Sequence, residues 1–279
     1  MTFEQLIDKN KALVVNCGMG TNSIALLVLL HQKGLRPDVI LFADVGNEMP
    51  HTYDYIPILQ EWLAKVGFPK LSITRKKFKD GSTSTLYDYC IEKQTLPSLA
   101  YGNHTCSAKW KIQAMDVFYN NHPATKAVWG KFYRCSDIKN KVTKLIGFDS
   151  LEPERTCRFA LPKNTDNPAI IREKHKFDVS FPLQEWGYNR EDCTKIILEA
   201  GLPDPGKSAC FFCPSTQPEE ILAMSKSEPE LYQKAIKLEE VSQANPANKN
   251  KRVQGLRFGK KWTAVVQELT RGNVTPSTT

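Results

Sequence analysis

The sequence lacks any apolar run that could cross a lipid bilayer. The longest apolar run in the sequence, from Ile24 to Leu30, is far shorter than the roughly 20 residues that a transmembrane helix requires. The N-terminal stretch MTFEQLIDKN also lacks the basic segment followed by an apolar one that is typical of a secretory signal peptide. We therefore expect a cytoplasmic protein that makes no contact with a membrane.

Cysteine is sparse, with 8 residues in a chain of 279. This density excludes a secreted disulfide scaffold and favours buried thiols, metal ligands or catalytic groups. Repeats are missing as well, and only the stretch GNVTPSTT has the composition of a disordered segment. What is present, 41% hydrophobic and 24% charged residues, is typical of one large globular domain or of a core domain with an appended lobe.

The net charge of +8 includes several basic stretches. These are RKKFK (75–79), KNKVTK (139–144), NKNKR (248–252) and GKKW (259–262). Such stretches attract phosphates, including those of nucleic acids, but a solvated surface explains them equally well.

The first part of the chain alternates buried strands with helices. Continuous apolar segments predict strands over 12–16, 38–45 and 70–74, with helices between them over 23–34 and 52–67. Apolar strands joined by helices predict an α/β, Rossmann-like fold, in which an open and mainly parallel sheet carries helices on both faces.

The remainder is expected to be mainly helical. Helices are predicted over 84–94, 107–121, 189–201 and most of 218–243, with one further strand over 142–148. The helix over 107–121 would begin behind Thr105 or Ser107 as its cap.

The stretch VVNCGMGTNS (14–23) passes from the first strand through a short loop into a helix. It contains neither the Gly-x-Gly-x-x-Gly fingerprint nor the Gly-Lys-Ser/Thr end of a P-loop. Gly18 and Gly20 nevertheless permit close backbone approach, and the helix start supplies N–H groups that suit an anion. By itself the pattern favours a tight turn over a phosphate-binding loop.

The second strand ends in FADVGNEMPHTYDYI. Together with the loop, this segment resembles the adenine-nucleotide PP-loop enzymes, and among them the phosphoadenosine phosphosulfate reductase-like group. That group has Ser-Gly-Gly-x-Asp-Ser after strand one and Asp-Thr-Gly-x-Glu-x-Pro-x-Thr-Tyr after strand two. The second motif is matched by Asp44, Gly46, Glu48, Pro50, Thr52 and Tyr53. The loop departs from the first, with Gly18 at the serine, Met19 at the first glycine and Asn22 at the aspartate.

A third segment, LIGFDSLEPER (145–155), is similar to the group's Gly-x-x-x-x-Glu-x-x-Arg region and adds Asp149. The planar fork of Arg155 suits phosphate or sulfate oxygens, although an exposed salt bridge is the alternative for this residue. The resemblance implies nucleotide contacts from Gly18, Met19, Gly20, Thr21, Asn22, Ser23, Asp44, Gly46, Gly147, Asp149 and Glu152, and catalytic roles for Asp44, Glu48 and Arg155. It covers roughly residues 10–215.

The motif KSACFFCP holds Cys210 and Cys213 at a spacing that suits one metal centre. Two further ligands are needed, and we expect them to be Cys106, at a helix start, and Cys193, in the helix that leads into the motif. Cys106 also matches a position at which iron–sulfur members of the resembled group carry cysteine. A [4Fe–4S] cluster is the preferred interpretation, while structural Zn²⁺ uses the same four-cysteine set. A thioredoxin-type pair fits this late loop poorly.

The resemblance implies ATP and Mg²⁺ as ligands, with attack on the α-phosphate and release of pyrophosphate. True sulfonucleotide reductases of the group use a C-terminal cysteine, and this chain has none after Cys213. We therefore expect a cluster-containing enzyme that transfers sulfur to DNA or tRNA, assisted by a sulfur donor protein. The alternatives are a sulfonucleotide reductase with an external thiol and a non-catalytic nucleotide or nucleic-acid binder with structural zinc.

The expected organisation follows from these motifs. A PP-loop nucleotide-binding domain with the cysteine site would span 1–215, a helical basic extension 216–270 and a disordered tail 271–279. The sequence indicates no particular oligomeric state.

Overall fold

The computed structural model describes residues 3–9, 12–102, 106–130, 138–157, 173–248 and 253–272. The chain divides into two compact units. The first unit comprises Met1–Ala43, Pro50–Thr74 and Met115–Ser208, and the second comprises Asp44–Met49, Arg75–Ala114 and Ala209–Thr279. Within the described residues, no helix combines the length and the apolar character needed to span a membrane. The boundary expected at 215 stays a prediction of the sequence.

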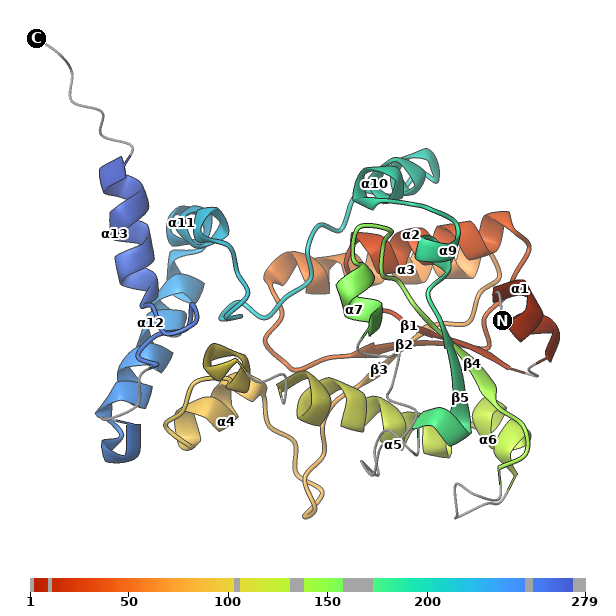
Figure 1. Cartoon of the computed structure of the whole chain (residues 1–279), viewed down its shortest axis with the longest axis horizontal. Coiled ribbons are helices and arrows are strands. Elements are labelled where there is room, and N and C mark those ends of the chain that lie inside the picture. Colours follow the sequence, from red (N-terminus) through yellow and green to blue (C-terminus); the bar gives the residue numbers. More distant parts are fainter. Residues whose placement is uncertain are drawn as a thin grey trace, which may run out of the picture. The chain divides into compact units, whose positions relative to one another are not determined.

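The first unit is built on a parallel sheet of five strands in the order β3-β2-β1-β4-β5 (Figure 1). The strands are β1 (Leu13–Asn16), β2 (Val39–Ala43), β3 (Leu71–Thr74), β4 (Val142–Ile146) and β5 (Phe177–Ser180). Val15 pairs with Ile40 on one side and with Leu145 on the other. The expected α/β class, with an open parallel sheet, is confirmed.

Helices cover both faces of this sheet, because its strands are apolar on both (Figure 1). One face carries α1 (Phe3–Lys9), α2 (Thr21–Gln32), α3 (Pro50–Lys65), α9 (Pro182–Glu185) and α10 (Arg190–Glu199), and the other carries α5 (Gln113–Asn121) and α6 (Pro123–Trp129). Val15 and Ile40 enter the core under α2, whereas Val14 and Leu41 enter the core that contains Tyr119 of α5. The alternation of side chains along each strand thus fills two separate cores.

Strand β5 was not expected from the sequence. Its two end residues, Phe177 and Ser180, are buried, while the two between them are partly exposed. Its sequence, FDVS, holds only two apolar residues, and no predicted helix precedes it, whereas the equally short edge strand β3 follows a predicted helix.

The second unit is helical. It contains α4 (Leu86–Glu92), the 3-10 turns Ser98–Tyr101 and Pro246–Asn248, α11 (Pro218–Ser227), α12 (Pro229–Ala244) and α13 (Trp262–Gly272). The helix expected over 107–121 begins instead as a π-helix over Ser107–Ile112, which continues into α5. Of the tail expected over 271–279, Arg271 and Gly272 end α13, and the rest lies outside the described residues.

Glu239 of α12 is a buried carboxylate that ties two chain segments together. Its Oε1 accepts hydrogen bonds from the backbone N–H groups of Leu256 (2.8 Å) and Trp262 (3.1 Å). Burial raises the pKa of Glu239 to about 7, although these hydrogen bonds and the charge of Lys261 lower it. The neighbouring charge of Glu240 raises the pKa further.

The raised pKa of Glu239 predicts a pH-dependent stability. Between about pH 4.5 and 7 the folded protein keeps a proton that the unfolded chain releases, so this group stabilises the fold less as the pH rises through that window. Glu239→Gln retains the acceptor oxygen without the charge, and it should remove this slope. The gain at pH 8 has an upper limit of roughly 3 kcal/mol, since a tenfold change in proton affinity is worth about 1.4 kcal/mol.

The measurement is the free energy of unfolding in urea at pH 5 and pH 8. Glu230→Gln is the matched control, because Glu230 is exposed on the same helix and is not among the charges that shift the pKa of Glu239. Equal pH slopes for wild type and Glu239→Gln would contradict the assignment.

Candidate functional site

The loop between β1 and α2 is a tight turn with backbone strain. Met19 has a φ of 63°, a left-handed conformation that a bulky residue rarely adopts, and its side chain is fully buried. This is the position at which the resembled group carries glycine, the residue that such a backbone favours. The turn is closed by Ser23 Oγ and by Ser23 N–H, which both donate to the carbonyl of Gly20.

The segment 203–208 covers this loop. Thr21 N–H donates to the carbonyl of Gly206 (3.1 Å), and Thr21 Oγ1 donates to Asp204 Oδ1 (2.7 Å). Ser208 Oγ donates to the carbonyl of Gly18. Arg190 at the start of α10 donates from Nη2 to Thr21 Oγ1 (3.0 Å). The loop therefore has a guanidinium beside it, while the first helical N–H is satisfied by protein.

Asn22 links the loop to the end of β4. Its Nδ2 donates to Asp149 Oδ2 (2.9 Å) and to Glu152 Oε2 (3.2 Å), so one amide holds two carboxylates. Asn22 is 8% exposed, and its Oδ1 has no hydrogen-bond partner among the described residues. An aspartate here would place a third carboxylate against the other two. The presence of Asp149 thus accounts for an uncharged amide at position 22 in place of an aspartate.

Gly147 allows this junction to form. A Cβ at Gly147 would lie 2.8 Å from the backbone oxygen of Asn22, closer than real Cβ contacts come. The strand end therefore packs directly on the start of α2. In this way the structure brings the predicted residues of 147–155 to the predicted residues of 18–23.

Arg155, expected to clamp an anion, forms the alternative salt bridge with Glu152. Its Nη1 lies 2.6 Å from Glu152 Oε1, and its guanidinium stacks 4.0 Å from the ring centroid of Phe148. The Arg155 side chain is 52% exposed, and such a surface pair contributes about 0–1 kcal/mol. Arg155 could therefore leave Glu152 and bind an oxygen of an anionic ligand at little cost in free energy.

In the second unit, Asp44 is held by a cation and by its own chain. Its Oδ2 accepts from Arg75 Nε (2.9 Å) and Nη2 (2.5 Å), and its Oδ1 accepts from Gly46 N–H (2.7 Å). Gly46 has a φ of 82°, and a Cβ there would lie 2.7 Å from a Thr85 methyl group. Both the turn conformation and the space at this position therefore require glycine.

Glu48 forms a buried ion pair with Lys111. Lys111 Nζ lies 2.8 Å from Glu48 Oε1 and comes from the π-helix, a type of turn that is often found at functional sites. Burial lowers the pKa of Lys111, but the charge of Glu48 and the nearby Cys210 and Cys213 raise it above its ordinary value. Lys111 therefore places a lasting positive charge beside these two cysteines.

Three of the four predicted thiol ligands, Cys106, Cys210 and Cys213, belong to this second unit. Cys213 N–H donates to the carbonyl of Cys210 (3.0 Å), which forms a turn, and Cys106 N–H donates to Ser98 Oγ (2.7 Å). Burial raises the pKa of Cys210 and of Cys213, and the charge of Cys106 raises both further. As free thiols they stay protonated at neutral pH, so they are not activated nucleophiles.

The other two cysteines of interest are Cys193 and Cys90. Cys193, the fourth predicted ligand, belongs to the first unit, where it is buried in the core that α10 forms with α2. Cys90 of α4, to which the sequence assigned no role, is buried in the second unit. Burial and the charge of Cys106 raise the pKa of Cys90 to about 12. Among the described residues, no three His, Cys, Asp or Glu side chains form a group that could hold a metal ion.

Sequence reasoning missed several residues at the loop, namely Arg190, Asp204 and Ser208. They follow the loop by at least 165 positions, and no spacing rule connects them to it. The signal that could have found them is local, because a polar helix start and a Pro-rich turn often flank a ligand site.

The carboxylates around position 22 predict the effect of restoring the acid. Asn22→Asp should destabilise the first unit by about 1–3 kcal/mol, since it places three carboxylates together and removes two hydrogen bonds. Millimolar Mg²⁺ should recover part of this loss, because carboxylate oxygens are its preferred protein ligands. The free energy of unfolding with MgCl₂ and with NaCl of equal ionic strength provides the measurement.

Asn120→Asp is the control, since Asn120 Oδ1 already accepts from Lys176 Nζ and a carboxylate there gains an ion pair. An Asn22→Asp protein as stable as wild type without Mg²⁺ would show that the three side chains do not meet in solution.

No protein-family model matches this sequence, and the search of curated proteins found no match either. The assignment of a function therefore depends on the residues of the site themselves.

Proposed function

We propose that the protein is an ATP-dependent PP-loop enzyme that activates a nucleic-acid acceptor for sulfur transfer or a related modification. The observation that carries the proposal is the junction at Asn22. Two segments that resemble the same enzyme group, 18–23 and 145–155, are far apart in sequence and share hydrogen bonds in the structure. A chance resemblance of two separate segments would not predict that they meet.

The residues of the first unit suit a magnesium nucleotide. Asp149 and Glu152 supply carboxylate oxygens for Mg²⁺, and the guanidinium groups of Arg155 and Arg190 suit phosphate oxygens. Positioning and neutralisation of charge by such groups provide most of the catalysis in phosphoryl-type transfers. The acceptor would attack the α-phosphate, and pyrophosphate would leave.

Asp44 and Glu48 belong to the second unit. Each carboxylate is paired with a cation, Asp44 with Arg75 and Glu48 with Lys111. We propose that they position these cations and do not transfer protons themselves.

For the cluster we propose the four thiols of the second unit. Cys90 is part of the main core of that unit, and Cys106 and Cys210 pack against the same core, with Cys213 in a turn beside Cys210. A [4Fe–4S] cluster spreads its thiolates over four irons, so its ligands lie farther apart than those of a single zinc ion. The Lys111 ammonium offsets part of the negative charge that thiolate ligands bring. When bound, the cluster would supply the sulfur chemistry.

Nucleotide binding is tested by Asp149→Asn. Removal of this carboxylate should weaken the affinity for Mg·ATP at least tenfold, about 1.4 kcal/mol, because one cation ligand is lost. Isothermal titration calorimetry with a non-hydrolysable ATP analogue gives the affinity. Glu154→Gln, an exposed change on α7 (Pro153–Cys157), is the control.

Turnover is tested with anaerobically purified protein, Mg²⁺, ATP and either DNA or tRNA. The proposal expects release of pyrophosphate and fails if wild type neither binds ATP nor releases pyrophosphate with any polynucleotide. Release of sulfite from adenylyl sulfate instead would identify a sulfonucleotide reductase that uses an external thiol.

The thiol assignment is tested by Cys90→Ser and Cys193→Ser. Cys90→Ser should lose most of the iron and the visible absorption of the anaerobic protein, while Cys193→Ser should keep both. The opposite result would restore Cys193 as the ligand. A colourless wild-type protein with stoichiometric zinc would favour a structural metal and the non-catalytic alternative.

A further inference from the structure

A short hairpin precedes α13 in the second unit. Arg257 and Lys260 pair across it, with Arg257 N–H donating to the carbonyl of Lys260 (3.1 Å) and Lys260 N–H donating back (3.0 Å). Phe258 and Gly259 form the tip with φ angles of 50° and 96°. Two positive φ angles define a type I′ turn, whose first position favours Asn, Asp or Gly. Phenylalanine is thus a poorly suited residue for this position.

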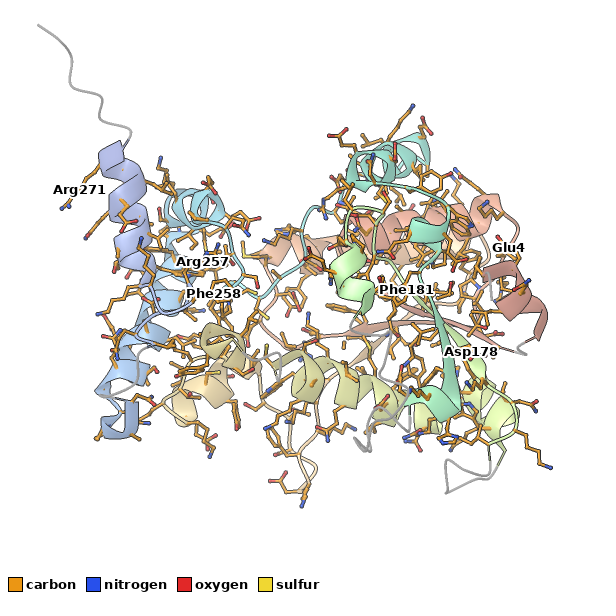
Figure 2. The ribbon with its side chains drawn as sticks, in the orientation of Figure 1. Glu4, Asp178, Phe181, Arg257, Phe258 and Arg271 are labelled. Atoms are coloured by element: carbon orange, nitrogen blue, oxygen red, sulfur yellow. The ribbon has the colours of Figure 1, made fainter. Side chains whose placement is uncertain are left out.

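The phenylalanine ring is also poorly buried. Phe258 is 54% exposed, one of the few large apolar side chains of the described chain that are open to solvent. The guanidinium of Arg257 lies 4.9 Å from the ring centroid (Figure 2). The position therefore combines backbone strain with an exposed aromatic ring, and neither contributes to the stability of the fold. Strain that brings no gain in stability is typical of functional positions.

The base of the hairpin is held firmly. Leu256 and Trp262, on either side, are fully buried, and both donate their backbone N–H groups to the carboxylate of Glu239. Gly255 has no room for a side chain, since a Cβ there would lie 2.3 Å from the carbonyl group of Lys260. Arg257 Nη2 also donates to Gln217 Oε1 (3.2 Å) ahead of α11. The ring is thus presented on a fixed support.

The stretch of chain that carries the ring contains only positively charged residues among its charged ones. Residues 253–267 contain Arg257, Lys260 and Lys261 and no carboxylate. Lys260 forms an exposed pair with Glu268, a kind of contact that contributes little in water. Lys261 is exposed. An exposed ring with a guanidinium beside it and two exposed lysines next along the chain complements a base between phosphates better than a protein surface of mixed charge does.

We propose that the hairpin 255–261 is a contact for single-stranded nucleic acid, in which a base stacks on Phe258 and the flanking phosphates lie against Arg257, Lys260 and Lys261. Bases in a duplex are already stacked on one another, so a single exposed ring reads an unpaired base. The inference rests on the proposed function, because it names where the acceptor would be held.

Phe258→Asn separates binding from stability. Asparagine suits the first position of a type I′ turn, so the melting temperature should stay equal or rise, while the affinity for a strand falls at least fivefold, the lower end of what one stacked base contributes. The probe is a fluorescein-labelled 20-mer of deoxythymidine, measured by anisotropy at 50 mM salt without ATP. A duplex of equal length should bind more weakly than the single strand and should show no loss with Phe258→Asn.

Two further variants keep the test decisive. Phe258→Leu retains apolar bulk without an aromatic face and should lose affinity as Phe258→Asn does, whereas Phe258→Tyr should keep it. Leu198→Asn, an equally exposed apolar change on α10, should leave binding unchanged.

The inference is overturned if wild type fails to bind the strand, if Phe258→Asn binds as wild type does, or if strand and duplex lose affinity equally. The inference is also overturned, in favour of a membrane surface, if Phe258→Asn weakens binding to anionic lipid vesicles but not to the strand. Because the assay contains no ATP, a failure of pyrophosphate release would leave this result standing, and the reverse also holds.

Discussion

One side-chain amide determines the geometry of the candidate nucleotide site. Asn22 opens the first long helix, and its Nδ2 spans to Asp149 and Glu152 beyond the fourth strand. Two carboxylates that would otherwise repel each other are thereby held beside a loop that faces the carboxyl ends of the strands. Gly147 leaves the room that this junction needs, and Arg155 neutralises part of the charge of Glu152 from the other carboxylate oxygen.

The sequence predicts those features whose cause is local. Strands β1 and β2 lie in nearly continuous apolar segments, and β3 and β4 are rich in β-branched residues, so their position and parallel arrangement follow from the pattern. Strand β5 and the π-helix over Ser107–Ile112 do not, because a strand with two buried end residues and two partly exposed ones between them shows no alternation, and a change of helical pitch leaves no periodic trace. The motif residues of 18–23 and 147–155 are predictable, whereas the partners of Thr21 come from the distant 190–208 region.

The burial of titratable groups is a feature of this protein that sequence patterns do not reveal. Cys90 lies inside an ordinary helix, and nothing in its spacing separates it from a core residue. Glu239 similarly reads as part of a charged helical face, although it is buried and holds the base of a hairpin. Glu48 was identified from its motif, and Lys111 belongs to the basic helix start behind Cys106, but the pairing of these two residues becomes recognisable only in the structure. Burial of a charge is a tertiary property, and the sequence around it carries little of that information.

The segment 203–208 occupies the very N–H group that a phosphate would use at the start of α2. Gly206 supplies the carbonyl and Asp204 the carboxylate, so the chain itself behaves as a tethered competitor for the helix terminus. The apparent affinity for any anion is then the intrinsic affinity reduced by the fraction of molecules in which this segment has moved away. The more stable the closed segment is, the lower the affinity for an anion becomes. A change that weakens the Asp204 contact would therefore destabilise the closed segment and raise the affinity for an anion.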